Sequence, residues 1–348
     1  ARPAIAAGTA IVMMETLNDF GTVDYFAVQT LTTGIFSIWL ESYDPGGAAQ
    51  LAVLAALIVA GLLGVEQIGR RRARFHKSGR QLAPIQPQPL SSRQGAAVLL
   101  YCLVPMGLGF LIPLMVLVAP VVSNLSHWSD TGLWRAAAHS LALGGASAGL
   151  VVTLATVMVL GLQKTPAAWK KSLLTLTTVG YAFPGAVLGL GILIPLATFD
   201  NWLADLVFAT FRRDPGLLLT GSAGALIVAY CVRFFAIGVG AAEAGLAAIS
   251  TNIPLAASTL GHAPRDVVLN IYQPLMRGSL ASAMVLVFVD TVKELPATLL
   301  LRPFNFDTLS THVYEQASLE NFHGSTPAAL LIITLSFGAI FLLAKAHR

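Results

Sequence analysis

The chain has 348 residues, of which 55% are hydrophobic and 11% are charged, whereas about 25% of the residues in a typical soluble domain are charged. This composition excludes an ordinary soluble domain and predicts a polytopic membrane protein. The net charge of +4 does not indicate nucleic-acid binding, because the basic residues are concentrated in loops where the positive-inside rule expects them.

Eight stretches are apolar and long enough to cross a membrane, which takes about 20 residues as a helix. The sequence therefore predicts an all-α, polytopic transmembrane helical bundle with about eight spans. We expect a further amphipathic helix at residues 200–211, lying on the outer membrane surface. The predicted spans lie near residues 3–20, 46–66, 96–121, 136–162, 173–197, 217–241, 277–295 and 326–344.

Lysine and arginine set the predicted orientation of these spans. The segment Gln67–Arg93 contains seven of them, and the loop Gln163–Ser172 contains three more. Basic loops remain in the cytoplasm. With eight spans, both ends of the chain are then predicted to be cytoplasmic, and the acid-rich alternate loops lie outside.

The spans near both ends of the chain contain an internal repeat. The segment Arg2–Val23 aligns without a gap with Arg277–Thr298, and two acids four residues apart occur in each copy. Residues at i and i+4 share one face of a helix, and a carboxylate inside an apolar helix is costly enough to indicate a function. The repeat pairs Glu15 with Asp290, Asp19 with Glu294, and the helix-breaking Gly21 with Pro296.

The repeat also predicts how the chain is divided. The unit that contains residue 277 begins near residue 96, so we expect the first copy to lack roughly 180 residues before residue 1. Residues 1–66 are then the end of a first unit, 67–95 a basic cytoplasmic linker, and 96–348 a complete second unit. Internal repeats of this kind are typical of transporters, whose pathway lies between the repeats.

The four repeated acids are therefore candidates for the substrate pathway. Glu15 and Asp290 lie deeper in their spans, whereas Asp19 and Glu294 precede helix breakers, so an interfacial salt-bridging role is the alternative for the outer pair. Arg233 is either a counter-ion for Glu15 and Asp290 or a side chain that extends to the cytoplasmic interface. Carboxylate oxygens suit a small, highly charged cation, but no firmly bound metal and no catalytic residue is expected.

A polar segment, residues 250–276, separates the sixth and seventh spans. Asn252 is expected to cap a short helix that Gly261 ends, and Pro264 is expected to start a second helix. Val267, Val268 and Ile271 then share one face. From this pattern alone, the segment is either a docking element or an amphipathic helix on the membrane surface.

This segment contains Ala256, Ala257, Gly261, Ile271 and Pro274. Their spacing resembles that of the coupling loop of ABC importer permeases, which have the MetI-like fold. In that family the loop contacts a cytoplasmic ATPase dimer, which uses ATP and Mg²⁺, so the resemblance implies that this chain has no cofactor of its own. The chain departs from the family pattern at Leu255, where the family has Glu, and at Gln273, where it has Leu.

A narrower resemblance covers essentially the whole chain. Residues 15–39, 180–185 (GYAFPG) and 293–318 resemble the two-unit permeases of ferric iron importers. Membership of that family implies a subunit of the bacterial inner membrane that carries Fe(III) delivered by a periplasmic iron-binding protein. It also implies that this subunit is not itself an enzyme.

Two other classes of transporter remain open. One is a permease of the same fold for another solute, such as thiamine, a polyamine or a phosphonate. The other is an ion-coupled secondary transporter, which has no reason to keep a coupling loop. A membrane enzyme is disfavoured, because no nucleophile and base occur at a usable spacing.

Overall fold

The computed structural model describes residues 2–72, 90–123, 125–213, 215–250 and 252–346. All regular structure in these ranges is helical, as predicted. The long helices are α1 (Arg2–Asn18), α4 (Pro45–Arg72), α5 (Ser92–Met106), α6 (Ile112–Ser123), α7 (Thr131–Gly161), α8 (Ala167–Ala182), α9 (Gly185–Phe211), α10 (Ala223–Ala247), α13 (Gln273–Lys293) and α16 (Phe322–Ala346). The shorter helices are α2 (Gly21–Tyr25), α3 (Leu31–Leu40), α11 (Asn252–Thr259), α12 (Pro264–Val267), α14 (Pro296–Leu301) and α15 (Leu309–Ser318).

Helices α7, α10 and α13 form the centre of the bundle and pack against one another. Small residues allow this close approach. A Cβ atom at Gly238 would lie 2.9 Å from the side chains of both Ala155 and Val151. Without a hydrophobic effect between helices in lipid, such close packing is a main source of their association.

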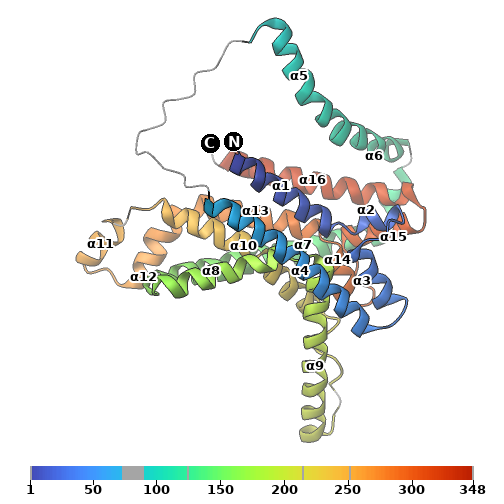
Figure 1. The fold of residues 1–348 in the computed structure, drawn as a ribbon. Helices are drawn as coiled ribbons and strands as arrows, with labels where there is room; N and C mark the ends of the chain where they lie inside the picture. The colour runs from blue at the N-terminus through green and yellow to red at the C-terminus, as the bar shows by residue number, and fades with distance from the viewer. Residues whose placement is uncertain (1, 73–89, 124, 214, 251, 347–348) are drawn as a thin grey trace.

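The short helices mark the two ends of the bundle (Figure 1). Helices α11 and α12 lie at one end, called the α11 end below, whereas α2, α3 and α15 lie at the opposite end, the α15 end. Helix α9 projects from the bundle, and α5 is separated from it. Helix α6 joins α5 to the rest by packing against α16.

Seven helical segments within the described residues are long and apolar enough to cross a membrane, one fewer than predicted. The stretch expected to span at residues 3–20 forms α1, which has 17 residues. The seven segments are Pro45–Val65, Ser92–Val122, Thr131–Gly161, Gly185–Phe211, Ala223–Ala247, Pro264–Lys293 and Phe322–Lys345.

The predicted fifth span, residues 173–197, is wrong, because the chain breaks in its middle. Phe183 and Pro184 have extended ψ angles of 141° between α8 and α9. Proline disfavours the α conformation of the residue before it and has no N–H to continue the ladder. The hydrophobic run that predicted one span is therefore divided between two helices.

The separate surface helix predicted at residues 200–211 is also wrong, since these residues are the second half of α9. Asp200 is buried there and accepts hydrogen bonds from the backbone N–H groups of Leu219 and Thr220. This contact fixes the loop before α10. Helix α10 consequently begins at Ala223, capped by Ser222, rather than near residue 217.

The repeat recognised in the sequence is present in the structure, where it extends beyond the aligned residues. Each copy has a long helix, a break, a short helix, a second short helix and a final long helix: α1 to α4 in the first copy and α13 to α16 in the second. Helices α3 and α15 begin with the same capping box, in which Thr30 and Thr33 correspond to Thr308 and Thr311.

One hydrogen bond ties each capping box to the preceding break. The Thr32 hydroxyl donates to the carbonyl oxygen of Asp19 at 2.9 Å, and the Ser310 hydroxyl donates to the carbonyl oxygen of Glu294 at 2.7 Å. Asp19 and Glu294 are the acids that the sequence repeat pairs. The two copies thus share backbone architecture at the break, which the sequence alignment alone does not show.

The division of the chain into units at residues 66 and 96 stays a prediction. Much of the basic linker, residues 73–89, lies outside the described residues.

Ser310→Ala and Thr32→Ala should each lower the free energy of unfolding in detergent by about 1 kcal/mol, because each removes one hydrogen bond. Thr32→Ser keeps the hydroxyl and should retain most of the stability. Thermal unfolding of the purified protein measures these changes. Equal stability of Thr32→Ala and Thr32→Ser would contradict the role given to this bond.

Candidate functional site

The breaks after α1 and α13 bring the predicted pathway acids together at the interface of the two copies. The chain leaves both helices in the same way. The Asp19 carboxylate accepts the N–H of Thr22 at 3.4 Å, and the Glu294 carboxylate accepts the N–H of Ala297 at 3.3 Å. Phe20 and Leu295, which follow the two acids, have similar backbone angles.

Glu294 forms a buried ion pair with Arg233 of α10. The Nε atom of Arg233 lies 3.1 Å from Oε2 of Glu294, and their side chains are 11% and 6% exposed. Arg233 also donates to the carbonyl oxygen of Phe183, at the break between α8 and α9, at 3.4 Å. One guanidinium therefore joins two helix breaks through its separate N–H groups.

Gly185 is the residue that makes room for this pair. A Cβ atom there would lie 2.5 Å from Oε1 of Glu294 and 2.8 Å from a terminal nitrogen of Arg233. The GYAFPG segment noted in the sequence thus supplies both a break and the space beside it.

The other acid of the second copy has a different environment. Asp290 lies 2.9 Å from Nζ of Lys293, whose side chain is 58% exposed. Glu15 of the first copy is close enough to act electrostatically on the same ammonium group. Neither Glu15 nor Asp19 forms an ion pair with any residue in the described part of the chain.

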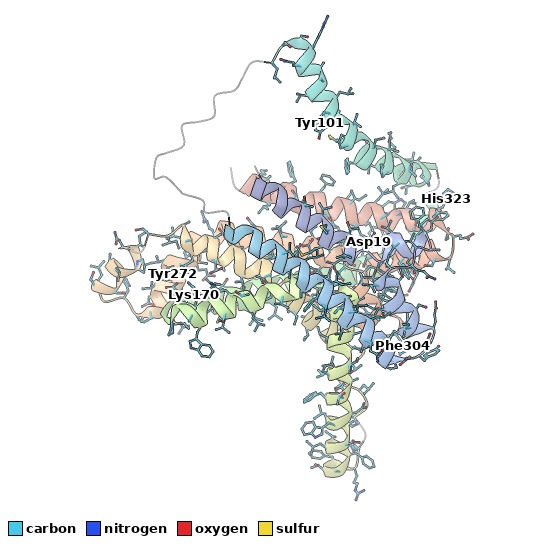
Figure 2. All side chains as sticks on the ribbon, viewed as in Figure 1. Asp19, Tyr101, Lys170, Tyr272, Phe304 and His323 are labelled. Carbon is cyan, nitrogen blue, oxygen red and sulfur yellow. The ribbon has the colours of Figure 1, made fainter. Side chains whose placement is uncertain are left out.

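A cavity of about 670 Å³ lies between the two breaks. It is lined by three of the four predicted pathway acids but not by Asp290, and Arg233 and Lys293 add two positive charges. The first copy therefore contributes acids without ion-pair partners, and the second contributes one paired with arginine. The lining residues are Glu15, Thr16, Asn18, Asp19, Phe20, Gly21, Thr22, Arg233, Lys293, Glu294, Leu295 and Pro296. Figure 2 labels Asp19 within the bundle.

A thin wall separates this cavity from two others nearer the α15 end. Gly21, Thr22 and Leu295 line both the 670 Å³ cavity and one of about 580 Å³, and Phe20 lines both it and one of about 680 Å³. Phe20 is buried and stacks on Phe36 at 4.0 Å between ring centroids. The residues that follow the two repeated acids therefore form a partition between the cavities.

Tyr314 and Asp24 connect the two copies beyond the partition. The Tyr314 hydroxyl lies 3.0 Å from Oδ2 of Asp24, and both residues line the two cavities at this end. Burial, followed by the hydrogen bond to Asp24, raises the pKa of Tyr314 to about 12. The phenol therefore stays protonated and donates to Asp24 at neutral pH.

The coupling-loop candidates lie at the α11 end of the bundle. Gly261 has a φ angle of +84°, and His262 N–H bonds to Ala257 O while Gly261 N–H bonds to Ser258 O. This is a Schellman motif, so the predicted helix stop at Gly261 is confirmed. Asn252 is the first residue of α11 rather than its cap, whereas Pro264 starts α12 as predicted.

The residues of this segment are divided between a buried face and an exposed face, as their pattern predicts. Ala257 and Val267 are buried against α7 and α10, and Val268 and Ile271 pack on the same cluster. Ala256, Gly261 and Pro274 are exposed. Leu255 and Leu260 are also exposed, so an apolar surface remains outside the bundle.

Within the described residues, no group of three or more His, Cys, Asp or Glu side chains is arranged to hold a metal ion. The acids that line the 670 Å³ cavity remain candidates for contact with a passing substrate, and that role stays a prediction.

Sequence reasoning offered Arg233 as a counter-ion for Glu15 and Asp290, or as a side chain that extends to the interface, whereas Arg233 pairs with Glu294. It did not find the partition or the contact between Tyr314 and Asp24. A signal for some ion pair existed, since an arginine in an apolar span requires a partner. No sequence motif marks the partition or the contact between Tyr314 and Asp24, because each brings together residues that are far apart in the chain.

No protein-family model matches the chain. Solved structures of a bacterial alginate ABC transporter match it with TM-scores of 0.60 and 0.57 at 14% sequence identity. Both matches cover 73% of this chain, and they cover 93% and 96% of the matched chains. The chain is thus a multi-pass membrane protein with the MetI-like fold of ABC transporter permeases, as predicted.

Sequence similarity to known permeases narrows this class further. The chain is 27% identical over 357 aligned residues to the Fe(3+)-transport system permease protein FbpB 2 of Haemophilus influenzae, a match that covers 99% of this chain. The predicted resemblance to ferric iron permeases is confirmed. The chain spans 66% of the length of that relative. A second match, 23% identical over 66% of this chain and 81% of the relative, is a putative 2-aminoethylphosphonate transport system permease protein, PhnV, of Salmonella typhimurium.

Glu294→Gln should destabilise the protein by about 3–5 kcal/mol, because it leaves the buried Arg233 guanidinium without its counter-ion. Asp290→Asn is the matched control and should cost at most about 1 kcal/mol, since its partner Lys293 is largely exposed. Replacing Arg233 and Glu294 together by Leu should recover most of the loss. Denaturant unfolding in detergent distinguishes these outcomes. Equal effects of the two single substitutions would show that the buried pair has no special role.

Proposed function

We propose that this chain belongs to the membrane-spanning permease subunit of an ATP-driven importer that carries Fe(III) into the cytoplasm across a bacterial inner membrane. The observation that carries the proposal is the similarity to an Fe(3+)-transport permease along 99% of the chain. The cavity between the two repeats supports it, because carboxylate oxygens are suitable ligands for a hard cation.

The arrangement of cavities supports a route along the interface of the repeats. A substrate arriving at the α15 end meets the cavities that Tyr314 and Asp24 line, then the wall of Phe20 and Leu295, and then the cavity that contains Glu15 and Asp19. In this proposal the wall is the gate of the route. Movement of the two breaks against each other would open it, since the wall residues are part of the breaks.

The proposed partners follow from the two ends of the bundle. A periplasmic iron-binding protein would deliver Fe(III) at the α15 end. A cytoplasmic ATPase dimer would bind α11 and α12, where Leu255 and Leu260 are exposed. Leu255, at the position of the family's Glu, makes this contact more apolar. The partner hydrolyses ATP with Mg²⁺, and the permease performs no covalent chemistry.

Ferric-loaded binding protein should stimulate ATP hydrolysis by the full-length permease reconstituted in vesicles with its ATPase. It should also drive uptake of radioactive iron, because only the loaded form carries substrate to the α15 end. The iron-free binding protein is the control. Since a phosphonate permease also matches part of the chain, a binding protein loaded with 2-aminoethylphosphonate is the second arm. Stimulation only by the protein loaded with 2-aminoethylphosphonate would overturn the assignment of iron as substrate, but not the assignment of the chain to an importer.

Glu15→Gln combined with Asp19→Asn should lower iron uptake by at least about tenfold, because it removes the two cavity carboxylates that lack an ion-pair partner; this corresponds to about 1.4 kcal/mol of lost stabilisation of the moving cation. Asp205→Asn, an exposed acid on α9 away from the cavity, is the control. Assembly with the ATPase should be normal in both variants. Normal uptake by the double variant would remove these acids from the pathway.

A further inference from the structure

The two cavities at the α15 end share one polar pair, Tyr314 and Asp24. Tyr314 belongs to α15 and Asp24 to α2, and these two helices pack against each other (Figure 1). Both side chains are half-buried. Both line the cavity of about 580 Å³ and the cavity of about 680 Å³. A small ion in either cavity can therefore reach the same two oxygen atoms.

The spacing of these two oxygen atoms fits a chelate. The Tyr314 hydroxyl oxygen lies 3.0 Å from Oδ2 of Asp24. Neighbouring ligand atoms around a small octahedral cation are about 2.8 Å apart, because each lies about 2.0 Å from the ion. The phenol and carboxylate oxygens can thus take adjacent positions on one ion with little movement, once the proton between them has left.

The chemistry of the pair favours a highly charged cation. Phenolate and carboxylate are hard oxygen ligands, and tyrosine is a ligand of ferric iron in some haem proteins. Burial, followed by the hydrogen bond to Asp24, raises the pKa of Tyr314 to about 12, so the pair holds one proton when no ion is present. A bound cation lowers the pKa of a group that coordinates it, and a trivalent ion does so more strongly than a divalent one.

The same pair is attached to the wall between the cavities. The rings of Tyr314 and Phe20 lie 5.6 Å apart between centroids. The Asp24 N–H donates to the carbonyl oxygen of Phe20 at 2.9 Å. Phe20 in turn follows Asp19, whose side chain lines the next cavity. An ion held by Tyr314 and Asp24 would therefore lie directly beside the wall.

We propose that Tyr314 and Asp24 form a transient entry site for Fe(III) on the outer side of this wall. The inference rests on the proposed function, which brings Fe(III) to the α15 end. Fe(III) binds the phenolate oxygen of Tyr314 and one carboxylate oxygen of Asp24, and the phenol proton passes to water. Water or an anion that accompanies the iron fills the other positions. With two protein ligands, the ion is released readily toward Glu15 and Asp19.

Absorption spectroscopy of the purified full-length permease, titrated with ferric nitrilotriacetate, tests this site. Coordination of Fe(III) by a phenolate produces a visible charge-transfer band, which carboxylate ligands alone do not produce. The wild-type protein should develop this band. Tyr314→Phe keeps the ring against Phe20 and should abolish the band. It should also lower the affinity at least about tenfold, since loss even of a group that only supports a ligand typically costs about 10- to 100-fold.

Asp24→Asn is the second variant. Its amide oxygen can still accept the Tyr314 hydrogen bond, so the contact between the copies is kept, but the charge is lost. It should lower the affinity for iron at least about tenfold. Tyr25→Phe is the matched control, because Tyr25 is 51% exposed and lines the 580 Å³ cavity. It should leave the band unchanged. Thermal unfolding of each variant verifies that it is folded.

Survival of the band in Tyr314→Phe, or its loss in Tyr25→Phe, would overturn the assignment of Tyr314. Uptake of radioactive iron from the ferric-loaded binding protein is measured in parallel in vesicles. Normal uptake by a wild-type protein that shows no band would overturn the entry site and leave the proposed function intact. The two proposals can therefore fail separately.

Discussion

The ion pair between Arg233 and Glu294 is the interaction on which the centre of this bundle depends. A guanidinium in an apolar bundle is stable only with a counter-ion and with its remaining N–H groups satisfied. Here the counter-ion comes from the break after α13, and a further acceptor is the Phe183 carbonyl at the break after α8. Three separate helices are thereby fixed relative to one another by one side chain.

This arrangement constrains the backbone around it. Helix α8 approaches α10 so closely that a Cβ atom at Gly180 would collide with the carbonyl oxygen of Val232. Gly185 has to remain small for a similar reason, because Glu294 and Arg233 occupy the adjacent space. The glycines and proline of the GYAFPG segment thus bring a broken helix up to a buried charge. For this placement of the chain, the hydrophobic residues around them are less important than the glycines and the proline.

The two repeats share their backbone but not their charge balance. Both breaks are tied by a hydroxyl to the carbonyl oxygen of an acid, and both acids accept an N–H three residues later. Within the described residues, however, only the acids of the second copy have basic partners, Arg233 and Lys293. The cavity between the copies is therefore asymmetric, with its unpaired carboxylates on one side. Equal spacing in the sequence did not imply equal roles.

The sequence by itself determined the helical class, most of the membrane helices, the repeat and the turn at Gly261, because these depend on local composition, on periodicity and on a glycine that accepts positive φ. It also contained the resemblance to ferric iron permeases. Only the tertiary structure decided that Arg233 pairs with Glu294 rather than with Glu15 or Asp290, and that Phe20 and Leu295 lie between neighbouring cavities. Each of these depends on residues that are distant in the chain and meet only when the helices pack, and spacing along one helix carries no information about such contacts.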